Sequence, residues 1–197
     1  MQARLLPFLS LVCLVLSGCS AYSAHPLYTT QDAVVEPALE GTWVSTPPDK
    51  DEISIQKSGE HEYSLTVPTS SEESVQTYKL NLVRLGNQLF ADMFFDSETV
   101  QGKKIDTPIG SVSMHVIIRI EVTGDQLSYA ILDQDALQKQ NALEAAPLKL
   151  LSIGDALVIT DETDSLRHYI SIHAADVFAK TDQLKRKAGA QQQPQSQ

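Results

Sequence analysis

The feature that most constrains the fold is an alternation of apolar and polar side chains, clearest over residues 113–122. Every second position there is apolar: Met114, Val116, Ile118, Ile120 and Val122. Side chains along a β-strand point alternately to its two faces, so this spacing predicts a strand with one buried face. Similar alternation, broken by turn residues every 8 to 12 positions, runs from Gly41 onward. The pattern is typical of an antiparallel meander.

The alternation and the turn signals also predict individual elements. We expect strands at residues 42–45, 52–56, 63–67, 75–85, 88–95, 113–122, 126–132, 148–152, 156–160 and 182–186, with a loop at 96–110. Two short helices are expected, one over residues 133–143 with Asp133 as its N-cap and one that begins after Asp161 or Thr163. An open sheet of so many strands would leave two exposed edges. We therefore predict a mainly β protein whose meander closes into a barrel or half-barrel.

The first 19 residues have the order of an export signal. Arg4 precedes a mostly apolar run at residues 5–16, and Ser17, Gly18 and Cys19 follow it. A helix needs about 20 apolar residues to span the ~30 Å hydrocarbon core of a membrane, so this run is too short to be a span. It is typical of the apolar region of a cleaved signal peptide over residues 1–18.

The sequence Leu16-Ser17-Gly18-Cys19 resembles the lipobox of bacterial lipoproteins. The resemblance implies that Cys19 receives diacylglycerol and an N-acyl chain and becomes the first residue of the mature protein. It also implies a location in the cell envelope, at the outer membrane and facing the periplasm, because Ser20 stands where an aspartate would favour inner-membrane retention. An ordinary secretory signal and display on the cell surface are the alternatives.

Charge and cysteine content narrow the partners of the mature chain. Arg4 is the only charged residue among the first 18, so cleavage would change the formal net charge from −10 to −11. Such an acidic chain disfavours nucleic acid as a partner. The two cysteines are Cys13, in the signal, and Cys19, so no disulfide is expected within the mature chain.

Composition divides the mature chain into three parts. Residues 19–40 are small, polar and interrupted by proline, which predicts a lipidated cysteine followed by a flexible tether. Docking of residues 25–28 on the domain is the alternative. The β domain should span residues 41–187, and the glutamine-rich residues 188–197 should form a disordered tail.

Short motifs of the domain resemble the lipocalins. Gly41-Thr42-Trp43 resembles the Gly-x-Trp motif of their first strand, and a late helix followed by a short final strand is also similar. With residues 84–90 and 159–160, these motifs are similar to uncharacterised bacterial lipoproteins with lipocalin-like β domains. The resemblance implies that Trp43 closes one end of the barrel and that Arg186 stacks on it. The expected helix at residues 133–143 departs from the standard strand order.

Motifs for catalysis and metal binding are absent from the linear sequence. It contains no Gly-x-Ser-x-Gly motif, no free cysteine in the mature domain and no pair of histidines four residues apart. We therefore expect a protein that is not an enzyme and that holds no metal and no cofactor apart from the lipid on Cys19.

Three residues are candidate ligand contacts. His115 and Arg119 share the polar face of the expected strand at 113–122, where they could hold an acidic head group, and Trp43 could stack on a ligand. Each also has a structural interpretation: His115 and Arg119 would face the solvent, and Trp43 would pack in the core. The favoured hypothesis is a lipid-anchored protein that binds a small amphiphilic or hydrophobic ligand. The alternative is an accessory envelope protein that acts through protein contacts, with a barrel filled by its own side chains.

Overall fold

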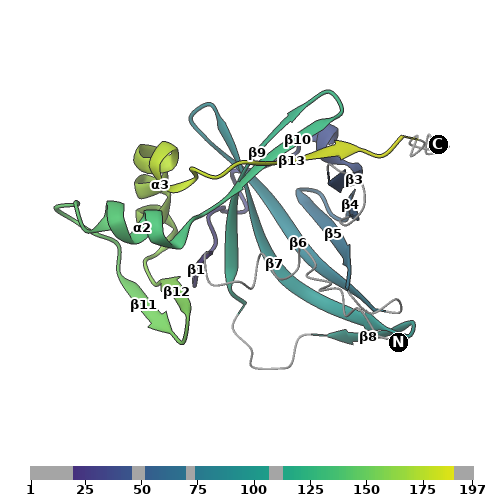
Figure 1. Ribbon diagram of the computed structural model, residues 1–197, viewed down its shortest axis with the longest axis horizontal. Coiled ribbons are helices and arrows are strands. Elements are labelled where there is room, and N and C mark those ends of the chain that lie inside the picture. Colours follow the sequence, from purple (N-terminus) through teal and green to yellow (C-terminus); the bar gives the residue numbers. More distant parts are fainter. Residues whose placement is uncertain (1–19, 46–51, 70–73, 107–112, 189–197) are drawn as a thin grey trace, which may run out of the picture.

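The computed structural model describes residues 20–45, 52–69, 74–106 and 113–188 (Figure 1). Its strands are β1 (Ala21–Ser23), β2 (Ala33–Val34), β3 (Gly41–Ser45), β4 (Glu52–Lys57), β5 (Glu62–Pro68), β6 (Ser74–Leu85), β7 (Gln88–Val100), β8 (Lys103–Asp106), β9 (His115–Thr123), β10 (Gln126–Ile131), β11 (Leu150–Ile153), β12 (Ala156–Ile159) and β13 (Asp182–Arg186). Its helices are η1 (Pro37–Leu39, a 3₁₀ turn), α2 (Gln134–Asn141) and α3 (Thr163–Val177).

Eight of the strands close into an antiparallel barrel. They follow the ring order β3, β4, β5, β6, β7, β9, β10 and β13, and β13 pairs with β3 to complete the ring. The expected fold class is confirmed: the chain forms a mainly β, lipocalin-like barrel with two short helices.

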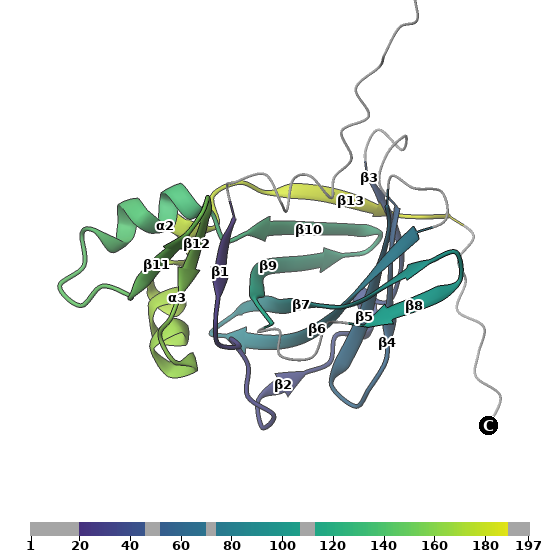
Figure 2. The ribbon, with the colours of Figure 1, turned by 90° about the horizontal axis from the view of Figure 1, so that it is seen from below.

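A second layer covers part of the outside of the barrel. β1 pairs with β9 and with β12, and β11 pairs with β12, so these strands extend the sheet beyond the ring. Figure 2 shows α2, α3, β11 and β12 together on one side of the barrel. The outward residues Phe90 and Ile117 pack there against α3 residues such as Ile170. The protein therefore has two apolar cores, one inside the barrel and one between the barrel and the helices.

The expected loop at residues 96–110 is partly wrong. β7 continues to Val100, and β8 pairs with its end in a hairpin. The turn between them is Gln101-Gly102, and both residues have positive φ, at 50° and 74°. Two successive left-handed residues suit the tight turns that match the twist of a hairpin. Residues 107–110 lie outside the described residues.

The expected flexible tether is wrong for residues 20–40, which are packed on the domain. Ala21, Leu27 and Leu39 are at most 1% exposed, and β1 and β2 pair with strands of the sheet. Asp32 forms an ion pair with Arg167 of α3. The composition of this segment suggested a coil because it is small, polar and interrupted by proline, yet Ala21, Leu27 and Leu39 each pack into a core. The signal peptide, Cys19 and residues 189–197 of the expected tail lie outside the described residues. Among the described residues, no helix is long and apolar enough to cross a membrane.

Arg186 connects the last strand to the start of the barrel. Its guanidinium carbon lies 4.2 Å from the centre of the Trp43 ring, so the stacking expected from the lipocalin resemblance is confirmed. Its Nη1 and Nη2 atoms donate to the carbonyl oxygens of Glu40 (2.6 Å) and Ala38 (2.8 Å). Gly41 adopts a φ of +140°, and a Cβ there would clash with the Arg186 guanidinium. The glycine of the motif is therefore required by close approach as well as by backbone conformation.

Replacing Arg186 with alanine should lower the free energy of unfolding by about 2 kcal/mol, because the variant loses a cation–π contact and two charge-assisted hydrogen bonds. Lys185→Ala is the matched control, since the Lys185 side chain is exposed on the same strand. Urea unfolding followed by the fluorescence of Trp43 measures both variants. Equal midpoints for the two would contradict this role of Arg186.

Asp133 begins α2 as the sequence predicted. Its Oδ1 accepts from the Ala136 backbone N–H at 2.9 Å, and its Oδ2 accepts from Lys180 Nζ at 2.9 Å. Burial acts to raise the pKa of Asp133, but the Ala136 N–H and the Lys180 ammonium outweigh it and hold the pKa below its usual value. A carboxyl with a depressed pKa stabilises the folded state above its unfolded pKa, and this contribution is lost as the pH falls through the folded pKa.

We expect Asp133→Ala to lower the free energy of unfolding by about 1 kcal/mol at pH 7, as for the loss of an N-cap. The difference from the parent protein should shrink as the pH falls below about 4, the ordinary pKa of an aspartate. Denaturant unfolding at several pH values measures it. A difference that stayed constant down to pH 2 would show that the charge of Asp133 contributes nothing.

Candidate functional site

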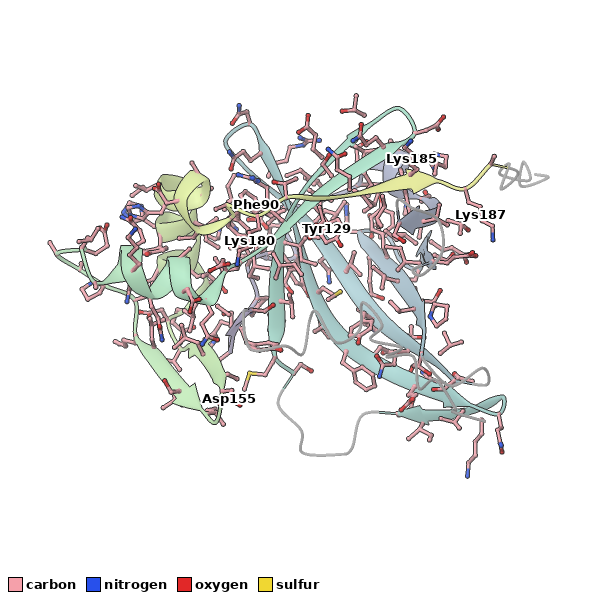
Figure 3. The ribbon with its side chains drawn as sticks, in the orientation of Figure 1. Phe90, Tyr129, Asp155, Lys180, Lys185 and Lys187 are labelled. Carbon is pink, nitrogen blue, oxygen red and sulfur yellow. The ribbon has the colours of Figure 1, made fainter. Side chains whose placement is uncertain are left out.

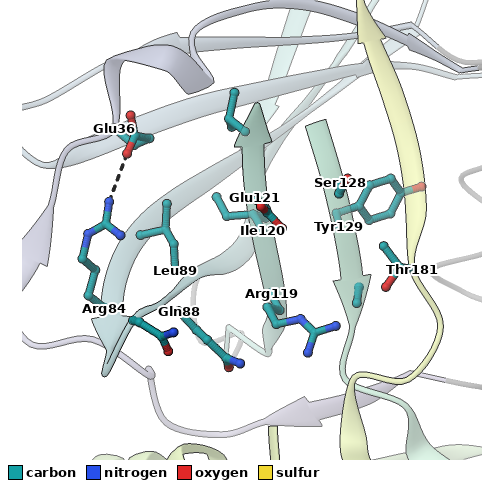
Figure 4. A pocket seen from close by; sticks show the side chains of 13 residues that line it. Glu36, Arg84, Gln88, Leu89, Arg119, Ile120, Glu121, Ser128, Tyr129 and Thr181 are labelled. Carbon is teal, nitrogen blue, oxygen red and sulfur yellow. Dashed lines mark hydrogen bonds and ion pairs between the residues drawn. The ribbon is translucent and has the colours of Figure 1, made fainter. Parts of the chain in front are cut away.

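A cleft opens where two hairpins of the barrel diverge. β7 and β9 pair from Met93 with Val116 to Leu89 with Ile120, and the pairing stops there. Beyond this point the β6–β7 and β9–β10 hairpins separate (Figure 1). The cleft between them has a volume of about 660 Å³ (Figure 4). Pockets of roughly 300 to 1,000 Å³ are the usual size for small-molecule sites.

The cleft has an apolar part and a polar part. Its lining residues are Glu36, Arg84, Asn87, Gln88, Leu89, Arg119, Ile120, Glu121, Val122, Ser128, Tyr129, Ala130 and Thr181. Leu89, Ile120 and Val122 belong to the face of the sheet that points into the barrel. Arg119 and Glu121 belong to the opposite face, because they alternate with Ile120 and Val122 along β9, and Ser128 shares that face because it pairs across from Glu121. A ligand in this cleft would therefore meet apolar and polar surfaces together.

Arg119 is the charged group in the cleft that is best placed to bind an anion. Its Nη2 donates to the Phe178 carbonyl oxygen at 3.0 Å, and its guanidinium carbon lies 5.9 Å from the centre of the Phe178 ring. A guanidinium has five N–H donors, so this bond leaves others for a ligand oxygen. Arg84 is in a different position, because it forms an ion pair with Glu36 at 3.0 Å. Arg119, one of the three candidate ligand contacts from the sequence, thus lies in the cleft.

His115 lies elsewhere and is buried. The solvent-facing interpretation of His115 is wrong, because the N-terminal segment and Phe94 cover this part of β9. Its role as a ligand contact stays a prediction, and His115 does not line the cleft. Its Nδ1 lies 2.6 Å from Asp92 Oδ1, and Asp92 Oδ2 accepts from the Leu27 backbone N–H at 2.6 Å. Asp92 has no exposed surface. The Asp92–His115 pair therefore fastens the N-terminal segment to the outside of the barrel.

The Asp92–His115 pair does not form a Ser-His-Asp triad with its cross-strand neighbour Ser23. The Ser23 hydroxyl donates to the carbonyl oxygen of His25 at 2.7 Å and accepts from the His25 backbone N–H at 3.2 Å. A serine nucleophile would have to give its proton to the histidine instead. We assign the pair a structural role.

Trp43 lies inside the barrel and contributes nothing to the cleft. It is completely buried, and its Nε1 donates to the Leu39 carbonyl oxygen at 2.9 Å. Around it the barrel interior is filled by apolar side chains such as Ile55, Tyr63 and Leu82. The three candidate ligand contacts are thus separated in the structure: Trp43 lies in the inner core, His115 in a buried pair and Arg119 in the cleft.

Most of the cleft has no signal in the amino-acid sequence. Glu36, Tyr129 and Thr181 come from three distant segments, and no local motif marks any of them. Arg84, Asn87, Gln88 and Leu89 belong to the 84–90 stretch of the family resemblance, which did not assign them to a site. The only sequence signal was the position of Arg119 on the polar face of a strongly alternating strand. Over the described residues, no group of three or more His, Cys, Asp or Glu side chains is arranged to hold a metal ion.

Comparison with known proteins gives no match to a family model, to a curated protein or to a solved structure.

Replacing Asp92 with alanine should destabilise the fold by about 3 kcal/mol or more, because it leaves the Leu27 N–H and the His115 imidazole buried without their partner. Asp92→Asn should cost much less, since its amide oxygen and nitrogen can retain both hydrogen bonds. Denaturant unfolding measures the two variants, and limited proteolysis should cut residues 20–32 faster in the alanine variant. If alanine and asparagine behaved alike, the two hydrogen bonds would not be what holds this segment.

Proposed function

We propose that the protein is a lipid-anchored protein of the bacterial cell envelope that binds a small amphiphilic ligand and catalyses no reaction. The anchor is the lipid on Cys19, as the lipobox resemblance implies. The favoured location is the outer membrane, facing the periplasm, because Ser20 follows the lipidated cysteine. The binding site is the cleft beside Arg119.

The observation that carries the proposal is the joint lining of this one cleft. Val122, together with the small accessible parts of the buried Leu89 and Ile120, offers an apolar surface for part of an acyl chain or for an aromatic group. Arg119 offers N–H donors for a carboxylate or phosphate, and such charge-assisted bonds are about twice as strong as neutral ones. Glu121 lies two residues further along the same face, so a head group that also carries a positive charge would be accommodated. Apolar and charged groups on one small ligand define an amphiphile.

Native mass spectrometry tests the binding. The Cys19→Ala variant, secreted to the periplasm behind an ordinary secretory signal peptide in place of residues 1–18, should carry a co-purifying mass that denaturation releases. Adding Arg119→Met should reduce bound ligand about tenfold or more, since losing a hydrogen bond to a charged group costs roughly 1.5 to 3 kcal/mol. Lys57→Met is the matched control, because Lys57 is exposed on β4 and does not line the cleft. Bare protein, even after incubation with envelope lipid extract, would rule out the amphiphile.

The second candidate function is contact with an envelope protein. β11 is an edge strand of the sheet, and its Leu151 and Ile153 are about half exposed. Unpaired strand edges with apolar side chains are sites for strand addition by a partner. Leu151→Lys together with Ile153→Lys should abolish capture of such a partner in envelope crosslinking and leave bound amphiphile unchanged.

A further inference from the structure

The chain is packed on the domain from Ser20 onward, directly after the proposed lipid attachment site at Cys19. Ser20 is 7% exposed and forms a β-bridge with Asp133, and the next residue, Ala21, is fully buried and donates its N–H to the Leu132 carbonyl oxygen at 3.0 Å. Cys19 is bonded to Ser20, and adjacent Cα atoms are about 3.8 Å apart. If Cys19 carries the proposed lipid, the surface around Ser20 must lie at the membrane. A flexible tether would have left every orientation open.

The surface around Ser20 includes the segment between α3 and β13. The Asp133 backbone N–H donates to the Val177 carbonyl oxygen at 3.0 Å, and Asp133 forms an ion pair with Lys180 at 2.9 Å. Figure 2 shows the start of β1 close to this segment. The chain then continues into β13, where Leu184 points into the barrel and Gln183 and Lys185 are exposed.

This segment also has the opposite charge to the rest of the chain. Residues 178–187 contain four basic residues and one acidic residue, a net charge of +3, while the whole chain has −10. Three of these basic residues form ion pairs with carboxylates nearby: Lys180 with Asp133, Arg186 with Asp125 and Lys187 with Glu52. Lys185 is exposed, so its ammonium group is the one most accessible to a lipid head group. Figure 3 shows Lys180, Lys185 and Lys187 along the segment. We define the β13 face by its exposed polar and charged residues, which are Lys180, Thr181, Asp182, Gln183, Lys185 and Lys187. A lysine near an anionic lipid surface contributes about 1 kcal/mol.

The cleft opens on the same side of the molecule. Thr181, which belongs to the β13 face, lines the cleft, and so does Ser128, which pairs across from Gln183. Arg119 donates a hydrogen bond to the carbonyl oxygen of Phe178, which lies two residues before Lys180. A bilayer at the β13 face would therefore bring lipid head groups to the rim of the cleft.

We propose that the β13 face rests on the anionic head groups of the bilayer that holds Cys19, so that the cleft beside Arg119 opens at the membrane surface and takes its amphiphile from there. This orientation rests on the proposed lipid anchor. The position of Ser20 and the place of Thr181 in the cleft support the same face independently, and the exposed Lys185 on that face suits anionic head groups.

Fluorescence quenching in vesicles tests the orientation. The full-length protein is processed in cells, purified in its lipidated form and reconstituted into vesicles of phosphatidylethanolamine and phosphatidylglycerol that contain a head-group quencher. The described residues include no cysteine, so a single new cysteine can be labelled. We compare Gln183→Cys, on the β13 face, with Lys79→Cys, on β6. β6 lies opposite β13 in the barrel ring.

We expect the label at position 183 to be quenched several-fold more than the label at position 79. Inserting about 20 Gly and Ser residues between Cys19 and Ser20 should reduce this difference, because the linker restores rotational freedom. Mass spectrometry of the same preparation establishes whether Cys19 carries lipid. An unmodified Cys19 would refute the proposed anchor and this orientation together. Equal quenching of the two labels on lipidated protein would overturn the orientation alone.

Discussion

The contact between Arg186 and Trp43 is the constraint on which the rest of the fold depends. The barrel closes only when β13, the last strand, returns to pair with β3, the first strand of the ring. Arg186 joins them by stacking on Trp43 and by binding the carbonyl oxygens of Ala38 and Glu40. One side chain therefore holds together the end of the chain, the start of the barrel and the segment that covers the Trp43 end. Closure creates an inside that apolar residues can fill and leaves no ring strand with a free edge.

Closure also determines the surroundings of β9, because one of its faces packs inside the barrel and the other packs against the outer layer. Ile120 points into the barrel core, while Ile117 points outward and is fully buried beneath the helical layer. A strand with one solvated face would alternate apolar and polar residues throughout. β9 instead carries His115 on the outward face, where burial is tolerated because Asp92 satisfies the imidazole. The buried polar pair is a consequence of covering a barrel on the outside.

Sequence patterns predicted those parts of the fold that depend on local alternation or on a specific motif. The strands of the ring, the cap of α2 at Asp133 and the stacking of Arg186 on Trp43 are all of this kind. The packing of residues 20–40 could not be predicted, because the cores into which Leu27 and Leu39 pack are formed by strands distant in the sequence. The cleft was equally hidden, because it arises where two hairpins separate, and separation of distant strands has no local pattern. Arg119 was identifiable as a residue but not as part of that cleft.

The order of the N-terminal segment links the outer core to the cleft. α3 ends at Val177, and the next residue, Phe178, packs its ring on Phe90 and accepts from Arg119 through its carbonyl oxygen. Asp32 and the Thr163 hydroxyl, which donates to the Pro26 carbonyl oxygen, tie α3 to the N-terminal segment. The position of the Arg119 guanidinium therefore depends on the position of α3. α3 in turn is held by the N-terminal segment, which begins next to the proposed lipid attachment site. The proposed anchor point and the proposed binding residue are therefore connected through the contacts of one helix.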